Sequence, residues 1–148
     1  MTYSHLLVPS DGSERSLEAV RQAVALAKAL GARLTFLHAQ ASVPIPVIGM
    51  GEMLDPHTMD LLVEAGQKDA ERILAEAKQV AAGEGMEAAT ERVLNDLPHR
   101  AIAETAERLG CDLIVMASHG RGGLPGLLLG SETQRVLVQS GIPVLVVR

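Results

Sequence analysis

The sequence predicts one α/β domain over residues 1–148, with a doubly wound, parallel five-stranded sheet and helices on both faces. Short aliphatic runs alternate along the chain with longer stretches in which apolar residues recur at helical spacing. Hydrophobic residues make up 47% of the sequence, and Phe36 and Tyr3 are its only aromatic residues. An aliphatic core of this kind suits helices packed on a buried parallel sheet.

The first elements are a strand, a helix and a second strand. Residues 5–8 are an apolar run that ends at Pro9, and residues 10–13 (SDGS) are turn and N-cap types. Apolar residues at helical spacing predict a helix over residues 14–30, and residues 34–39 (LTFLHA) form the next strand. Such a unit implies a right-handed crossover between two parallel strands.

Residues 40–57 interrupt this alternation with three prolines and two glycines among apolar residues. Loops of this length are usually lids, interfaces or disordered segments. A long helix then follows over residues 58–82, and its predicted inner face consists of Leu61, Leu62, Ala65, Ala70, Ile73, Leu74 and Ala77. The remaining elements are an edge strand over residues 87–93, a helix over 95–109 with Pro98 in its first turn, a buried strand over 113–116, a helix over 131–139 and a last strand, Val144–Val147.

Composition and charge exclude several classes of function. A net charge of -5 argues against binding to nucleic-acid backbones, and the lack of aromatic residues argues against stacking on single strands. Cys111 is the only cysteine, so neither an intramolecular disulfide nor a CxxC metal pair can form. The sequence has no recognisable leader and no run long enough to span a membrane, so we expect a cytoplasmic protein.

The strongest functional signal is the stretch LIVMASHGRGGLPGLLLGSET, over residues 113–133. A buried strand leads into a glycine-rich loop that ends at Gly130 and Ser131, at the start of a helix. Glycines let backbone N–H groups approach a ligand, and a helix start adds unpaired donors and a positive dipole end. Ligands of doubly wound sheets bind outside the carboxyl ends of the strands, where the turn at Asp11 would meet this loop. We interpret the stretch as the phosphate site of a nucleotide.

Two common fingerprints do not fit this loop: GxxxxGK[ST] is absent, and GxGxxG fails at Pro125. The loop instead resembles that of the universal stress protein (UspA-like) family, whose nucleotide-binding branch carries G-x2-G-x9-G-[ST] after the fourth strand. Here the pattern reads Ala117-Ser118-His119-Gly120, nine residues, then Gly130-Ser131. The segments HLLVPSDGSERSLEAV, LTFLHA, DLIVMASHGRGG, LLLGSETQRVL and PVLVV extend the likeness over the whole chain.

This resemblance implies an adenine nucleotide alpha hydrolase-like fold with strand order 3-2-1-4-5, and a ligand that is ATP or AMP, with Mg²⁺ able to accompany ATP. Asp11 would bond the ribose or adenine side, and Gly120, Gly130, Ser131 and Thr133 would present donors to the phosphates, with Arg121 as an added cation. The residues expected at the nucleotide are Pro9, Ser10, Asp11, Ala39, Met116, Ala117, Gly120, Arg121, Gly130, Ser131, Glu132 and Thr133.

Ala117 stands where the family pattern has its first glycine. If the site needs a positive φ there, the β-carbon costs roughly 1–2 kcal/mol. If the backbone is extended, the cost is local crowding only. We expect binding to be retained in either case, because the other glycines and Ser131 are present.

Other interpretations of the same residues stay open. Residues 131–134 (SETQ) read as a capping box, which explains Ser131 without a ligand, and Asp11 could equally cap the first helix. Glu132 would repel a phosphate. His119 suits a plain loop position better than a phosphate contact, and the other histidines lack the spacing of a metal site.

The sequence therefore favours an adenine-nucleotide-binding protein with a regulatory or stress-response role. One alternative is a dimeric interaction module that binds no nucleotide, which Ala117 keeps open. Another is a slow ATPase, which the residues favour less because Asp11 and Glu132 are the only acids of the site and the loop has no lysine. The wholly apolar strand Val144–Val147 would lie at a sheet edge, and with the resemblance it predicts an antiparallel homodimer across that strand, with residues 43–53 adding contacts.

Overall fold

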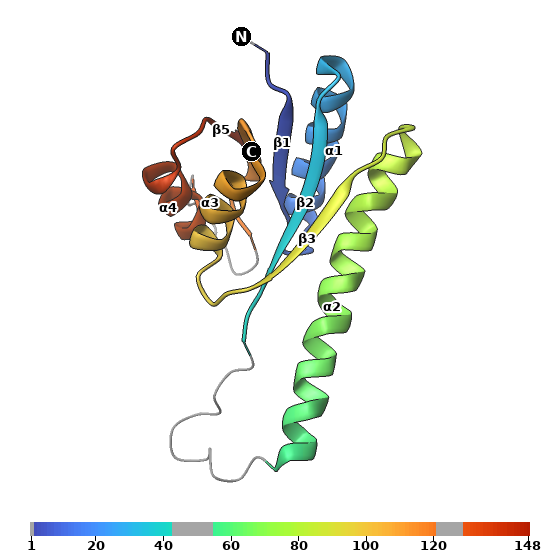
Figure 1. Ribbon diagram of the computed structural model, residues 1–148, viewed down its shortest axis with the longest axis vertical. Helices are drawn as coiled ribbons and strands as arrows, with labels where there is room; N and C mark the ends of the chain where they lie inside the picture. Colours follow the sequence, from blue (N-terminus) through green and yellow to red (C-terminus); the bar gives the residue numbers. More distant parts are fainter. Residues whose placement is uncertain (1, 43–54, 121–128) are drawn as a thin grey trace.

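The computed structural model describes residues 2–42, 55–120 and 129–148 of the chain (Figure 1). The proposed contacts of residues 43–53 therefore lie outside the described residues. The strands are β1 (His5–Pro9), β2 (Arg33–Gln40), β3 (Ala89–Leu94), β4 (Leu113–Ala117) and β5 (Val144–Val147). The helices are α1 (Glu14–Leu30), α2 (Pro56–Gly83), α3 (Pro98–Leu109) and α4 (Ser131–Gln139).

The five strands form one parallel sheet in the order β3-β2-β1-β4-β5, which confirms the predicted fold class and strand order. From β1 the chain winds outward to β2 and β3, then crosses back to β4 on the other side of β1 and continues to β5. The carboxyl ends of β1 and β4 therefore diverge into connections that leave in opposite directions. A crevice at this position is where such sheets bind ligands.

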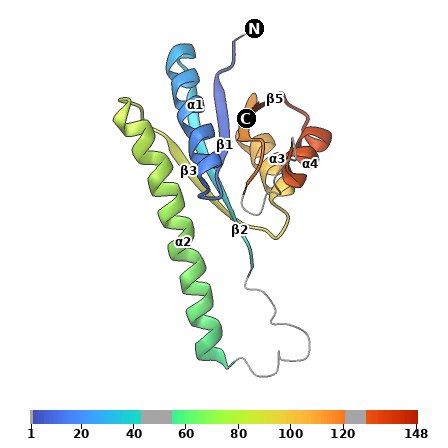
Figure 2. The ribbon, with the colours of Figure 1, turned by 180° about the vertical axis from the view of Figure 1, so that it is seen from behind.

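Helices cover both faces of the sheet, as Figures 1 and 2 show from opposite sides. Side chains of α1 and α2 pack on one face around Phe36, which is fully buried in β2. Side chains of α3 and α4, among them Ile102 and Val136, pack on the other face against Leu37 and Ile114. The aliphatic composition thus builds two cores that share one sheet.

The expected caps set several element ends. Ser13 is the N-cap of α1, and its side chain accepts a hydrogen bond from the Ser16 N–H. Gly31 ends α1 with φ 68°, a left-handed conformation that glycine adopts without strain. The helix α2 begins at Pro56, two residues before the predicted start, because Asp55 is its N-cap and proline is tolerated in a first helical turn.

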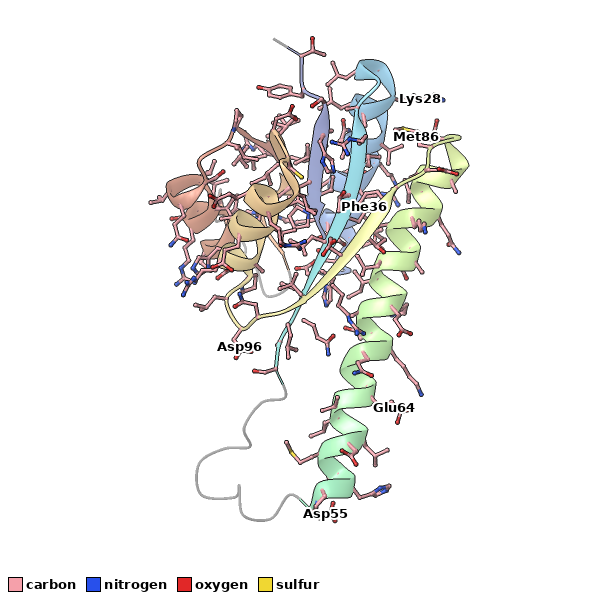
Figure 3. The ribbon with its side chains drawn as sticks, in the orientation of Figure 1. Lys28, Phe36, Asp55, Glu64, Met86 and Asp96 are labelled. Carbon is pink, nitrogen blue, oxygen red and sulfur yellow. The ribbon has the colours of Figure 1, made fainter. Side chains whose placement is uncertain are left out.

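The first half of α2 corrects one prediction. Leu61 and Leu62 are 52% and 41% exposed, and Ala65 is also exposed, whereas Ala70 and later inner-face residues are buried. A helix of 28 residues is about 42 Å long, while the eight-residue strand β2 spans only about 26 Å. The helix therefore extends past the sheet, and Figure 3 shows Asp55 and Glu64 on this projecting part, far from Phe36.

The strand β5 lies at one edge of the sheet and pairs only with β4 among the described strands. Leu145 is 43% exposed. The opposite edge is β3, as its polar sequence predicted. None of the described helices has the length and apolar character that crossing a membrane requires.

Candidate functional site

A cavity of about 430 Å³ opens at the carboxyl ends of β1, β2 and β4, beside the start of α4. Arg121 lies outside the described residues. Every other residue that the sequence placed at the nucleotide lines this cavity: Pro9, Ser10, Asp11, Ala39, Met116, Ala117, Gly120, Gly130, Ser131, Glu132 and Thr133. The turn after β1 and the loop after β4 thus converge, although more than a hundred residues separate them.

The turn after β1 is held by hydrogen bonds within it. Asp11 Oδ1 accepts from the Ser13 N–H at 2.9 Å and from Ser16 Oγ at 2.7 Å. Ser13 itself caps α1. Asp11 therefore braces the turn rather than serving as the N-cap, so the capping interpretation of Asp11 is wrong.

Two glycines of the loop are required by space rather than by backbone conformation. A β-carbon on Gly120 would collide with Asp11 Oδ2. A β-carbon on Gly130 would lie 3.3 Å from both the Ser118 carbonyl oxygen and His119 Cα, a tight approach. The Gly130 N–H donates to that same carbonyl at 2.6 Å. Among the described residues, positive φ angles occur only at glycines 12, 31, 85 and 110, so neither motif glycine uses one.

Ala117 is the last residue of β4 and is 7% exposed. No non-glycine residue in the described ranges has a positive φ. The backbone of Ala117 is therefore extended, so its β-carbon adds local crowding and no backbone strain, which was the second of the two cases considered from the sequence.

The start of α4 differs from the predicted capping box. Gly130 is the N-cap, with no side-chain cap hydrogen bond, and Ser131 is the first helical residue. Thr133 is buried and its hydroxyl donates to the Ala117 carbonyl at 2.9 Å, which ties α4 to the end of β4. The first N–H groups of a helix have no acceptor within it. Three residues of this first turn line the cavity, Ser131, Glu132 and Thr133, and α4 itself supplies no acceptor for their N–H groups.

Glu132 points to the neighbouring helix. Its Oε2 accepts from the His99 N–H at 2.9 Å and contacts His99 Nδ1 at 2.8 Å, while Oε1 accepts from Arg135 at 2.7 Å. Burial by itself would raise the pKa of the Glu132 carboxyl, but these hydrogen bonds outweigh it and lower the pKa. Because α3 has no side-chain cap from its own N-cap residue, Leu97, Glu132 caps it from α4. The repulsion expected between Glu132 and a phosphate is thus offset by Arg135 and by the start of α3.

Six further residues line the cavity: Ser16, Leu37, His38, Pro98, Ile102 and His119. Leu37 and Ile102 are buried core residues, and their sequence pattern gives no separate signal for a site. His38 Nδ1 lies 2.9 Å from the Ser10 carbonyl oxygen. His119 lies in the loop after β4, as expected, but it is only 5% exposed and forms part of the cavity wall. Its position two residues after a buried strand was the available signal.

The chemistry of the cavity differs from end to end. Pro9, Leu37, Ala39 and Met116 give it an apolar part, whereas the start of α4 supplies backbone donors. The described residues include no group of three or more His, Cys, Asp or Glu side chains that could hold a metal ion. The arrangement suits a ligand with a flat apolar part and an anionic part.

The strand order and the cavity at its reversal define the class of protein. The fold is that of the adenine nucleotide alpha hydrolase-like proteins. Residues 2–148 match the universal stress protein family, and the chain belongs to that family.

Similar proteins match over nearly the whole chain. Universal stress protein YxiE of Bacillus subtilis is 35% identical over 148 residues, which cover 99% of each chain. The structure of universal stress protein UspA from Lactobacillus plantarum has a TM-score of 0.84 at 26% identity and covers 100% of this chain and 99% of that one. A universal stress protein crystallised in complex with cAMP has a TM-score of 0.72 at 28% identity, over 100% and 98% of the two chains.

Proposed function

We propose that this universal stress protein binds an adenine nucleotide, ATP or AMP, in the cavity at the carboxyl end of its sheet and has a regulatory or stress-response role in the cytoplasm. The observation that carries the proposal is the contact between Asp11 and Gly120, which brings the β1 turn and the β4 loop to one cavity. The cAMP complex of a relative supports an adenine nucleotide as the ligand class.

The apolar part of the cavity would hold the base. Pro9, Leu37, Ala39 and Met116 offer aliphatic surface on which a flat purine can be buried. Asp11 and Ser10, at the turn between this part and α4, would face the ribose. Asp11 Oδ1 already accepts two hydrogen bonds, so the turn is rigid before a ligand arrives.

The start of α4 would hold the phosphates. The N–H groups of Ser131, Glu132 and Thr133 and the positive end of the helix dipole favour an anion there. Because the Thr133 hydroxyl is bonded to Ala117, we propose its N–H group as the phosphate contact. Arg121 would add a cation, and Mg²⁺ would enter with ATP, held by the phosphates.

Calorimetric titration with ATP, AMP and cyclic AMP, with and without Mg²⁺, tests this proposal. Gly130→Ala places a β-carbon against Ser118 and His119 and should weaken binding at least about tenfold, since the start of α4 must shift by several tenths of an ångström. Gly141→Ala is the matched control, because a β-carbon at Gly141 meets nothing within 4 Å. Equal affinity in both variants, or no binding by the wild-type protein, would overturn the proposal.

We also propose a homodimer that pairs the β5 edges in antiparallel fashion. The Pro143 and Val147 carbonyls accept hydrogen bonds from the β4 side. Because backbone direction alternates along a strand, Val144 and Val146 point their N–H and C=O groups away from β4. These groups lie on an apolar strand at an edge, where they can pair with a second chain.

Val146→Pro tests the dimer, because it removes an outward N–H group and leaves the β4 pairing in place. We expect the variant to be monomeric by light scattering with its helical circular dichroism retained. Leu145→Thr, which changes a half-exposed side chain but no backbone donor, should remain dimeric. A wild-type monomer at micromolar concentration would refute the proposal.

A further inference from the structure

His119 has one ring nitrogen with partners and one without. Its Nδ1 lies 2.7 Å from Arg15 Nη1 and 3.1 Å from Ser118 Oγ. Its Nε2 is buried and has no hydrogen-bond partner in the part of the chain that the structure describes. The ring forms part of the wall between the ligand cavity and a second cavity of about 420 Å³, which Arg15 lines. Buried polar atoms are normally satisfied, so this nitrogen calls for a partner.

The contact with Arg15 decides which nitrogen of His119 carries the proton. A guanidinium group has N–H donors and no acceptor, so Nδ1 must accept from Arg15 and bears no proton. The ring is then neutral with its proton on Nε2. His38 provides the opposite case, because its Nδ1 faces the Ser10 carbonyl, which only accepts. Nδ1 of His38 therefore carries a proton, whereas Nδ1 of His119 does not.

The unpartnered N–H group lies on the side of the ring next to α4. A β-carbon placed on Gly130 would be 3.8 Å from His119 Cδ2, the ring atom bonded to Nε2. Gly130 and Ser131 line the ligand cavity at this point. The Nε2–H group therefore lies close to the start of α4. It is covered in the structure, so a ligand oxygen reaches it only when this part of the wall shifts.

We propose that Arg15 is a positioning residue for ligand binding: it holds His119 in the Nε2–H tautomer, and this N–H donates to an anionic oxygen of the ligand. This inference rests on the proposed nucleotide function, because it needs an acceptor at the start of α4. Arg15 itself lies behind the ring and acts through it. A lysine could also donate to Nδ1, whereas a methionine could not.

Nitrogen-15 spectra of the imidazole rings, recorded without nucleotide, test whether Arg15 sets the tautomer of His119. We expect His119 to be protonated at Nε2 alone and His38 to carry a proton on Nδ1. Arg15→Met should give a mixture of His119 tautomers, and Arg15→Lys should restore the single one. Arg21→Met, which removes an exposed arginine of the same helix, is the matched control and should leave the rings unchanged. A wild-type His119 protonated at Nδ1 would overturn the inference whether or not a nucleotide binds.

AMP titrations test whether the Nε2–H group of His119 donates to the ligand. Arg15→Met should weaken AMP binding by the inverse of the fraction of His119 left in the Nε2–H tautomer, about twofold for an equal mixture, while Arg21→Met should leave the affinity unchanged. His119→Gln places an amide N–H near the position of Nε2, so it should keep most of the affinity. In the His119→Gln background, Arg15→Met should have no further effect, which a purely electrostatic role for Arg15 would not produce. Wild-type affinity in Arg15→Met would refute this inference alone, whereas no AMP or ATP binding by the wild-type protein would refute it together with the proposed function.

Discussion

Substitution of Gly120 by alanine tests the contact on which the site depends. The new β-carbon would collide with Asp11 Oδ2, so the Asp11 carboxylate must move. It would then lose its bonds from the Ser13 N–H at 2.9 Å or from Ser16 Oγ at 2.7 Å. A hydrogen bond to a charged group contributes about 1.5–3 kcal/mol, so we expect the free energy of unfolding to fall by about 2 kcal/mol. For a chain of this length, that lowers the melting temperature by roughly 4–8 °C.

Urea denaturation of a double-mutant cycle is the assay. Gly120→Ala and Asp11→Ala should each destabilise the protein, but the double variant should lose clearly less than the sum, because without the carboxylate the new methyl group has room. Gly141→Ala controls for the general effect of adding a methyl group to a glycine. Additive effects, or a Gly120→Ala variant as stable as the wild-type protein, would show that the two loops do not touch as the structure indicates.

Three further predictions concern the folded protein as a whole. Burial, helped by the charge of Arg33, lowers the pKa of His5 in the folded protein below its usual 6.5. The unfolded chain therefore binds this proton more readily than the folded protein does. The free energy of unfolding should be at its full value above about pH 6.5 and fall as the pH drops below it. Urea titrations should show a smaller fall in His5→Gln, and an equal fall would contradict the assignment. Burial raises the pKa of the Cys111 thiol to about 11, so a thiol reagent at mildly alkaline pH should label this cysteine only after the protein unfolds. Rapid labelling of the native protein would contradict the burial of Cys111. The exposed Leu62 and the buried Leu74 should respond differently to alanine. Leu62→Ala should change the free energy of unfolding by less than about 0.5 kcal/mol, whereas Leu74→Ala should lower it by about 2–5 kcal/mol. Similar values for the two variants in chemical denaturation would mean that the start of α2 is packed against the protein.

The sequence predicted the sheet and most element ends because local signals agreed with the fold. The cap at Ser13 and the left-handed Gly31 bound α1 as expected. The inner face of α2 was wrong at Leu61 and Leu62, since periodicity shows which side of a helix is apolar but not how far its partner extends. The length of β2 relative to α2 is a tertiary property, and no pattern within the helix reveals it.

The sequence predicted which residues form the site more completely than it predicted the contacts that these residues make. Every residue that two motifs and a family likeness predicted, and that the structure describes, lines one cavity, but six other lining residues were missed. The partners of Glu132 could not be foreseen, because the start of α3 lies 33 positions away in sequence. The SETQ segment matches a capping box, yet the preceding Gly130 takes the cap position because its N–H donates to the carbonyl of Ser118, at the start of the loop. In both cases a contact between elements outweighs a local preference.

These contacts also explain which positions of the loop tolerate a side chain. The family pattern has glycine at three positions, and this chain replaces the first of them with Ala117. The backbone of Ala117 belongs to β4 and needs no left-handed conformation, so a methyl group fits at the cavity wall. At Gly120 and Gly130 the limit is the short distance from a β-carbon to Asp11 and to Ser118. The cavity therefore depends on the absence of β-carbons at the second and third motif positions, while it accommodates the methyl group of alanine at the first.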